Sequence, residues 1–375
     1  MITTRAAVLR AMGAARPYAA SRPLAIETVT LDPPGRDEVR VRIRAAGLCH
    51  SDLSVINGDR PRPMPMALGH EAAGEVEAVG DGVGDLKPGD RVVMVFMPSC
   101  GCCAPCAGGR PALCEPGAAA NGKGELLGGG RRLHLGGETL HHHLGCSAFA
   151  ERAVVSRRSL VRVPDDLPFE HAALFGCAVL TGVGAVVNTA QVRAGQAVAV
   201  VGLGGVGLAS VLGALASGAS PVVAVDLSEE KLALARSLGP VRTVNAADPD
   251  AVEQVRALTG GGAEVALEMA GSAKALEAAW RMTRRGGTTV TAGLPPPEAA
   301  LAVNIVSLVA EERTLKGSYI GTCVPSRDIP RFVALFREGR LPVDRLLSGT
   351  AALEDINAAF DDLAEGRAVR TVISL

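Results

Sequence analysis

The amino-acid sequence predicts an α/β protein in which a doubly wound parallel sheet is joined to a second, β-rich part. Three observations support this prediction. Alternating apolar segments recur in the first 150 residues, strand-like and helix-like segments alternate after Ala172, and a glycine-rich turn joins the first such strand to its helix. The 375 residues also exceed what one hydrophobic core normally supports, so we expect two domains.

The β-rich part contains the clearest strand pattern. Residues 38–47, EVRVRIRAAG, place Val39, Val41 and Ile43 on one face and three arginines on the other. This alternation predicts a half-buried strand. Similar β signals recur at residues 74–80 and 90–96, separated by Gly, Pro and Asp turns.

The later part changes to alternating strands and helices. We expect a buried strand at 196–202, a helix after it, a strand at 221–226, and a helix that begins at the N-cap residue Ser228. Apolar runs at 263–271 and 286–294 continue the series, which is typical of a parallel doubly wound sheet. The tail predicts helices at 329–339 and 353–366 and a final strand at 371–375.

Composition and charge exclude several classes of protein. Hydrophobic residues make up 48%, charged residues 21%, and the net charge is -1, as in ordinary soluble globular proteins. The basic residues are scattered, so we expect no nucleic-acid partner. Arginines interrupt the apolar runs of the first 20 residues, which argues against a secretory signal and for the cytoplasm.

One uncharged stretch is long enough to cross a membrane. It comprises the 32 residues between Arg193 and Asp226. Seven of its glycine and proline residues, from Gly202 to Pro221, divide it into pieces of strand or helix length. We therefore expect no membrane span.

A dinucleotide site is predicted at residues 202–207. GLGGVG fits the G-x-G-x-x-G pattern and lies directly after a strand and before a helix, where a helix N-terminus can hold a pyrophosphate. The next strand ends at Asp226, 24 residues after Gly202, where a carboxylate binds an adenine ribose. No arginine follows in DLSEEK, which favours NAD over NADP. The predicted cofactor-binding residues are Gly202, Gly204, Gly205, Val206, Gly207 and Asp226.

Five cysteines lie within the fifteen residues from Cys100 to Cys114. Disulfides rarely persist in a reducing cytoplasm, and the spacing before the last cysteine does not match the bacterial ferredoxin run. Four thiolates can surround a structural zinc ion completely. We predict that Cys102 points away and that the ligands are Cys100, Cys103, Cys106 and Cys114.

A second set of possible metal ligands is dispersed along the chain as CHSD, GHE and FGC. The segments that carry a family resemblance are, in order along the chain, GLCHSD, GHEAAGEVEAVG, the four-cysteine loop, FGCAVLTGVG, GLGGVG, VDLSEEK and VRTVISL. By these segments, the chain closely resembles the zinc-dependent medium-chain alcohol dehydrogenases over its full length. The resemblance implies a GroES-like catalytic domain at residues 1–178 and 322–375 and an NAD-binding Rossmann domain at residues 179–321.

The resemblance also implies the roles of single residues. Cys49, His70 and Cys177 would bind a catalytic zinc whose fourth position is open, giving two zinc ions per chain. Asp52, and less directly Glu71, would orient the metal ligands, and Ser51 would take the alcohol proton toward the cofactor ribose. The remaining matched positions are His50 and Arg370 near the pyrophosphate, Thr181 near the nicotinamide, Lys231 near the adenosine ribose, and Phe96 and Leu294 in the substrate pocket.

Some positions depart from the family pattern. Ser54 replaces a histidine that releases the proton in many relatives, so proton exit must differ. Arg60, Arg62 and Ala118 stand where the glutathione-dependent formaldehyde branch has other residues, which argues against a glutathione adduct as substrate. Residues 121–149 resemble the long-loop, liver-type branch and favour a homodimer. We expect the three histidines at 141–143 to lie in a solvated loop rather than to bind a third metal.

The predicted function is therefore reversible, NAD-dependent oxidation of a small alcohol to an aldehyde or ketone. A polyol dehydrogenase of this family usually has glutamate at the position of Cys177, and a zinc-free reductase would lack the ligands. A non-catalytic nucleotide-binding or structural relative would be expected to have lost Cys49, His70 or Cys177, and all three are present. The sequence does not indicate which alcohol is the substrate.

Overall fold

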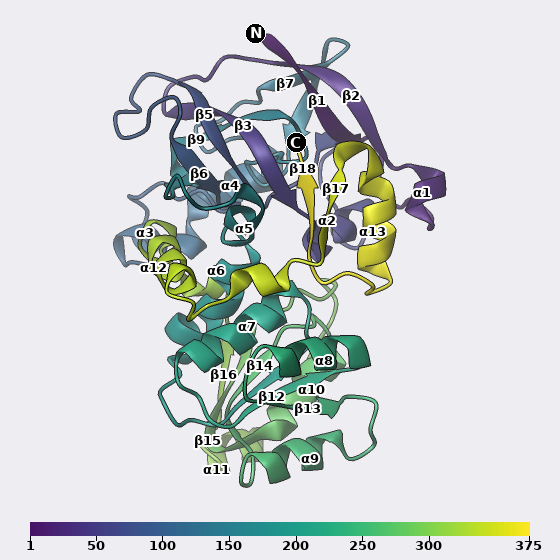
Figure 1. Ribbon diagram of the computed structural model, residues 1–375, viewed down its shortest axis with the longest axis vertical. Coiled ribbons are helices and arrows are strands. Elements are labelled where there is room, and N and C mark those ends of the chain that lie inside the picture. Colours follow the sequence, from purple (N-terminus) through teal and green to yellow (C-terminus); the bar gives the residue numbers. More distant parts are fainter. The chain divides into compact units, whose positions relative to one another are not determined.

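The computed structural model describes residues 1–375, which form two units (Figure 1). The first unit comprises Met1–Cys177, Val324–Val333 and Leu347–Leu375. The second unit comprises Ala178–Cys323 and Ala334–Leu346. None of the helices is both long and apolar enough to span a bilayer.

A closed barrel forms one half of the first unit. Its strands, in order around the barrel, are β1 (Ile2–Leu9), β2 (Leu24–Leu31), β7 (Leu133–Leu135), β8 (Glu138–His142) and β4 (Met66–Ala67). Inward-facing apolar residues such as Val8, Val29 and Leu140 are fully or almost fully buried and make one cluster. Closure of the barrel leaves few strand edges exposed to water.

A second sheet of the first unit is built around β3 (Glu38–Gly47). Val39, Val41 and Ile43 are buried, whereas Arg40, Arg42 and Arg44 are more exposed, so the predicted half-buried strand is confirmed. The last strand of the chain pairs antiparallel with β3. The sheet order is β10 (Leu160–Arg162), β6 (Arg91–Met94), β5 (Ala72–Val79), β3, β18 (Thr371–Ser374) and β17 (Gly349–Ala352), and β9 (Arg152–Ser156) also pairs with β3.

Short helices fill the connections of the first unit. They are α1 (Tyr18–Ser21), α2 (His50–Ile56), α3 (Ala104–Ala107), α4 (Glu115–Lys123), α5 (Phe169–Leu174) and α13 (Ile356–Ala364). The helix α12 (Pro325–Arg337) begins in the first unit and ends in the second.

The second unit contains the predicted parallel sheet. Its order is β13 (Val241–Asn245), β12 (Val222–Asp226), β11 (Val198–Val201), β14 (Ala263–Glu268), β15 (Thr283–Thr291) and β16 (Thr314–Gly317), and all neighbouring pairs are parallel. The order changes direction at β11, as expected for a doubly wound fold. Its helices are α6 (Ala178–Gly184), α7 (Gly205–Ala216), α8 (Glu229–Ser237), α9 (Ala251–Leu258), α10 (Ala273–Met282) and α11 (Ile305–Ala310). Ser228 caps α8, as predicted, because its side chain accepts a hydrogen bond from the backbone N–H of Lys231.

The uncharged stretch from 194 to 225 folds as β11, α7 and most of β12, confirming that it is divided into short buried elements. The prediction that the three histidines lie in a solvated loop was wrong for two of them. His142 and His143 are 0% and 1% exposed, because residues 138–142 form the barrel strand β8. Their side chains belong to the interior of the first unit.

Candidate functional site

Three candidate metal ligands converge in the first unit from separate connections. Cys49 is the N-cap of α2, His70 precedes β5, and Cys177 follows α5. Their ligand atoms all lie within 4.8 Å of one another, and the residues are 8%, 1% and 5% exposed. The Sγ atom of Cys177 is 3.6 Å from Nε2 of His70. The fold therefore assembles two sulfurs and one imidazole nitrogen in a buried place.

The three ligands influence one another's protonation. The hydrogen bond from the Cys177 thiol lowers the pKa of Cys49 well below its usual range, and the same contact raises the pKa of Cys177. Burial disfavours the charged form of His70, but the Asp52 carboxylate and Cys49 outweigh it and raise the His70 pKa. A divalent cation would stabilise both thiolates, because cations favour deprotonated ligands.

Two buried carboxylates accompany the ligands. Oδ1 of Asp52 lies 3.0 Å from Nδ1 of His70, which leaves Nε2 of that ring directed at the thiols. Oε2 of Glu71 lies 3.4 Å from Nη2 of Arg370. Burial raises the pKa of Glu71 to about 7, against the opposing effect of Arg370.

The chemistry of this donor set fits zinc. Two thiolates and an imidazole are ligands that zinc prefers, and three protein ligands leave a fourth tetrahedral position for water or substrate. The carboxylate behind the imidazole fixes the ring orientation, as is common at zinc sites.

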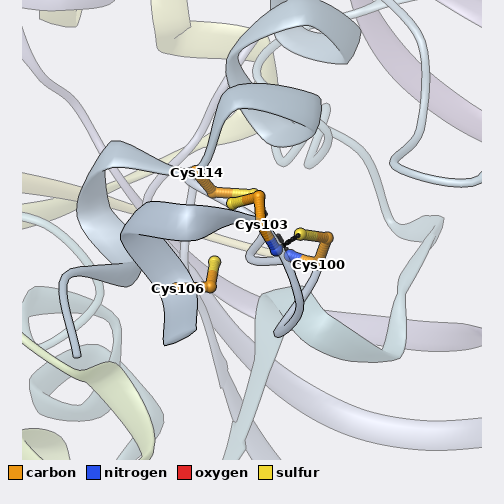
Figure 2. Close-up of side chains that lie close together, drawn as sticks. All are labelled: Cys100, Cys103, Cys106 and Cys114. Carbon is orange, nitrogen blue, oxygen red and sulfur yellow. Dashed lines mark hydrogen bonds between the residues drawn. The ribbon is translucent and has the colours of Figure 1, made fainter. Parts of the chain in front are cut away.

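The cysteine loop forms a second set of four ligands, with the sulfurs turned toward one another (Figure 2). Cys103 and Cys114 are the N-caps of α3 and α4, and their sulfurs are 3.9 Å apart. Zinc–sulfur bonds of about 2.3 Å in a tetrahedron require sulfurs about 3.8 Å apart. The set therefore has the dimensions of a closed zinc site without an open position. Cys102 is exposed and is not one of the four.

Backbone N–H groups prepare these sulfurs for negative charge. The N–H groups of Cys102 and Cys103 lower the pKa of Cys100 to about 6. The sulfur of Cys114 accepts hydrogen bonds from the N–H groups of Cys100 and Gly117, at 3.1 and 3.4 Å. Burial nevertheless raises the pKa of Cys106 to about 12, so a cation is needed to deprotonate all four thiols.

The glycine-rich turn lies between β11 and α7 in the second unit. Gly202 has φ of +90°, and a Cβ on Gly207 would lie 1.8 Å from the carbonyl oxygen of Gly202, so both positions require glycine. A Cβ on Gly204 would meet nothing within 4 Å. The open space beside Gly204, at the N-cap of α7, is where a phosphate could approach the backbone.

Asp226 lies at the end of β12 and contacts this turn. Its Oδ2 accepts a hydrogen bond of 2.6 Å from the N–H of Leu203, and its Oδ1 accepts one of 2.9 Å from Ser228. These bonds fix the carboxylate beside the glycine turn. The second unit thus has a phosphate-accessible helix N-terminus next to a partly exposed acidic side chain.

Comparisons with known proteins agree with this arrangement. The family model for the alcohol dehydrogenase GroES-like domain matches residues 35–165, and that for zinc-binding dehydrogenases matches residues 205–338. A protein of Mycobacterium tuberculosis (strain CDC 1551 / Oshkosh), provisionally named alcohol dehydrogenase D, is 40% identical over 95% of this chain and 97% of its own. The chain belongs to the zinc-dependent medium-chain alcohol dehydrogenase family.

Solved structures of alcohol dehydrogenases share the fold. An alcohol dehydrogenase zinc-binding domain protein from Burkholderia ambifaria has a TM-score of 0.94 and 38% identity over 100% of this chain and 99% of its own. Benzyl alcohol dehydrogenase from Acinetobacter calcoaceticus has a TM-score of 0.93 and 31% identity over 100% of both chains. A protein from Sinorhizobium meliloti 1021, provisionally named a zinc-binding dehydrogenase, was solved with NADP bound. It has a TM-score of 0.80 and 27% identity over 100% of both chains.

Other residues matched to alcohol dehydrogenase positions are divided between the two units. In the first, Ser51 and the exposed His50 lie on α2, and the ring of Phe96 contacts His70 edge-on at 5.3 Å. Arg370 is buried and donates to the carbonyl oxygen of Leu48 at 2.7 Å. In the second, Thr181 is buried on α6, Lys231 is partly exposed on α8, and Leu294 is 52% exposed.

Sequence reasoning missed one residue beside the cluster of Cys49, His70 and Cys177. His143 lies with Asp52 and His70, and the ligand-type atoms of the three are within 4.8 Å of one another. In the structure, the buried Leu140 and His142 alternate with more exposed neighbours along β8. The contact of His143 with Asp52 and His70 depends on the closed barrel, which the sequence did not predict.

Proposed function

We propose that the chain catalyses reversible oxidation of an alcohol to an aldehyde or ketone, with hydride transfer to NAD. The observation that carries the proposal is the buried set Cys49, His70 and Cys177, three ligands where four are needed. Two thiolates and a neutral imidazole would hold zinc. Zinc bound there would lower the pKa of an alcohol hydroxyl and so favour loss of its proton near neutral pH.

The residues around the metal position would perform the remaining steps. Asp52 would hold His70 in the tautomer that presents Nε2 to the metal. Ser51 would accept the alcohol proton, and Phe96 and Leu294 would line the substrate pocket. Ser54 donates a hydrogen bond to the carbonyl of His50, so we propose that the proton leaves through water rather than through residue 54.

We further propose that NAD, rather than NADP, binds the second unit. The Asp226 carboxylate would accept a hydrogen bond from the 2'-hydroxyl of the ribose and would repel a 2'-phosphate. Gly202 to Gly207 would hold the pyrophosphate, with Thr181, Lys231, His50 and Arg370 as further contacts. The wild-type protein should prefer NAD to NADP in kcat/KM, and Asp226→Ser should reduce that preference by about tenfold or more. A wild-type preference for NADP would refute this assignment.

The domain roles follow the same proposal. Residues 1–178 and 322–375 would form the catalytic domain and residues 179–321 the NAD-binding domain. The second zinc would be structural, held by the four-cysteine loop. All nine cysteines are free, and six of them are among the seven proposed metal ligands. Free thiols persist in a reducing compartment, so we propose the cytoplasm as the location.

We propose that the chain forms a homodimer. Ile305, Val306 and Val309 on α11 are 75%, 74% and 71% exposed, and Leu315 lies on β16, the last strand of its sheet. Exposed apolar side chains beside an unpaired strand edge commonly mark an interface between copies. Light scattering should give twice the chain mass, and Val309→Lys should shift it toward the monomer. A wild-type monomer would refute the proposal.

The enzymatic proposal is tested by metal analysis and a substrate panel. We expect two zinc ions per chain and NADH formation with a panel of aliphatic and aromatic primary and secondary alcohols. Cys49→Ala should retain one zinc and the fold while losing turnover, whereas Cys102→Ser should retain two zincs and full activity. Two bound zincs without turnover of any alcohol or aldehyde would instead favour a non-catalytic relative.

A further inference from the structure

Asp52 contacts two histidines with the same oxygen atom. Its Oδ1 lies 3.0 Å from Nδ1 of His70 and 3.1 Å from Nδ1 of His143. The three residues are 0%, 1% and 1% exposed, so water does not compete for these contacts. The second oxygen, Oδ2, has no hydrogen-bond partner. The orientation of this buried carboxylate therefore depends on the two imidazole rings.

Hydrogen bonds fix the backbone of His143. The N–H of His143 donates to Oγ of Ser147 at 3.1 Å, and its carbonyl oxygen accepts from the N–H groups of Cys146 and Ser147 at 3.0 and 3.1 Å. Leu144 and Ser147 both have φ of +51°, which closes a tight turn directly after the ring. A histidine anchored in this way can determine where its neighbour lies.

His70 is enclosed by rings on two sides. His143 contacts it edge-on, with centroids 5.5 Å apart and planes at 84°, and Phe96 does the same at 5.3 Å and 84°. Apolar packing alone could be supplied by any aromatic residue. The feature specific to His143 is its Nδ1 atom, which lies 3.1 Å from Oδ1 of Asp52 although the angle of this contact is not that of a hydrogen bond.

We propose that His143 is a positioning residue of the zinc site, which holds the Asp52 carboxylate in the orientation that aligns His70 with the metal. The proposal rests on the proposed function in that His70 is taken as a zinc ligand. In this proposal His143 acts through Asp52 rather than as a metal ligand. A carboxylate freed from His143 could rotate, and His70 would then lose its fixed ring orientation.

The expected effect is measured on zinc rather than on turnover. Residues hydrogen-bonded to metal ligands typically change metal affinity 10- to 100-fold when mutated. His143 acts one contact further away, so we expect His143→Phe, which keeps the ring but removes the nitrogen, to release one of the two zincs about tenfold more readily to a chelating dye. The four-cysteine zinc should be released at the wild-type rate in the same sample and serves as the internal reference.

Two further variants separate positioning from packing. His143→Asn keeps an N–H donor near the position of Nδ1 and should retain zinc nearly as the wild-type does. In the Asp52→Asn background, His143→Phe should have little additional effect, because the carboxylate through which it acts is gone. Thermal unfolding of each variant is recorded alongside zinc release. A variant that has lost its fold is thereby recognised, and the comparison is then made among the folded variants.

The outcomes distinguish this proposal from the enzymatic one. Wild-type zinc release in His143→Phe, equal losses in the Phe and Asn variants, or additive effects with Asp52→Asn would each overturn the positioning role. A wild-type protein that binds two zincs but oxidises no alcohol would overturn the enzymatic proposal while leaving the zinc-release test valid.

Discussion

His142 should make the first unit sensitive to acid. Its ring is completely buried at the end of β8, where Nε2 accepts a hydrogen bond of 3.0 Å from the backbone N–H of Arg132 and Nδ1 lies 3.4 Å from Oγ of Ser147. Protonation of Nε2 would break the bond to Arg132. Burial, together with the charges of Arg132 and Arg131, lowers the pKa of His142 to about 3.

The direction and size of the effect follow from this pKa. An unfolded histidine titrates near pH 6.5, so the stabilising effect of neutral His142 is complete above that pH and is lost progressively as the pH falls toward about 3. Between these values the unfolded chain holds one more proton at this site than the folded chain. The free energy of unfolding then falls by about 1.4 kcal/mol per pH unit, or about 2 kcal/mol between pH 6.5 and pH 5.

The assay is urea unfolding of the wild-type and His142→Gln proteins, followed by circular dichroism near pH 7 and near pH 5. Glutamine keeps a neutral acceptor for the Arg132 N–H but cannot be protonated in this range. Other groups that titrate, including His70 and the cysteines, contribute equally to both proteins. We expect the variant to lose about 2 kcal/mol less than the wild-type between the two conditions. Equal losses would refute the reasoning.

Two further predictions use matched pairs of variants. Gly204→Ala should lower the free energy of unfolding by less than about 1 kcal/mol, because its Cβ meets nothing within 4 Å and only the N-cap preference for glycine over alanine is lost. The same variant should weaken NADH binding measured by fluorescence titration. Gly207→Ala should destabilise the fold by about 1–3 kcal/mol, because its Cβ would lie 1.8 Å from a backbone oxygen. Tight NADH binding by Gly204→Ala would show that the phosphates do not approach there. Metal analysis should find two zincs per chain in Cys102→Ser and one in Cys103→Ser. The reverse result would show that Cys102, and not Cys103, is a zinc ligand.

Local patterns were sufficient for much of the fold. The alternation from Val39 to Arg44 predicted β3 because one face of that strand packs inside and the other meets water. The spacing around Gly202 predicted a strand, a turn and a helix because that geometry requires glycine at fixed positions. Both signals lie within a few residues of the structure that they predict.

Contacts between distant segments could not be predicted in this way. His143 lies 91 residues from Asp52 in the sequence, and the two meet only because the barrel brings the end of β8 to the start of α2. Glu71 and Arg370 are separated still further, and the burial of their pair depends on β18 joining β3. No local sequence pattern specifies which distant residues pair, although carboxylate, imidazole and guanidinium side chains can form such pairs.

The two ligand sets have a consequence for the charge of the protein. The formal net charge of -1 counts every cysteine as a neutral thiol. Zinc loading leaves the four thiols of the loop and the two at the other site deprotonated, which is six protons in exchange for two divalent cations when every thiol is counted as neutral at the start. The lowered pKa values of Cys49 and Cys100 make the number of protons released at neutral pH smaller than six. Metal uptake should therefore make this protein more acidic, by up to about two charge units, and release protons into the buffer. On isoelectric focusing, the loaded protein should migrate to a lower pI than the metal-free one.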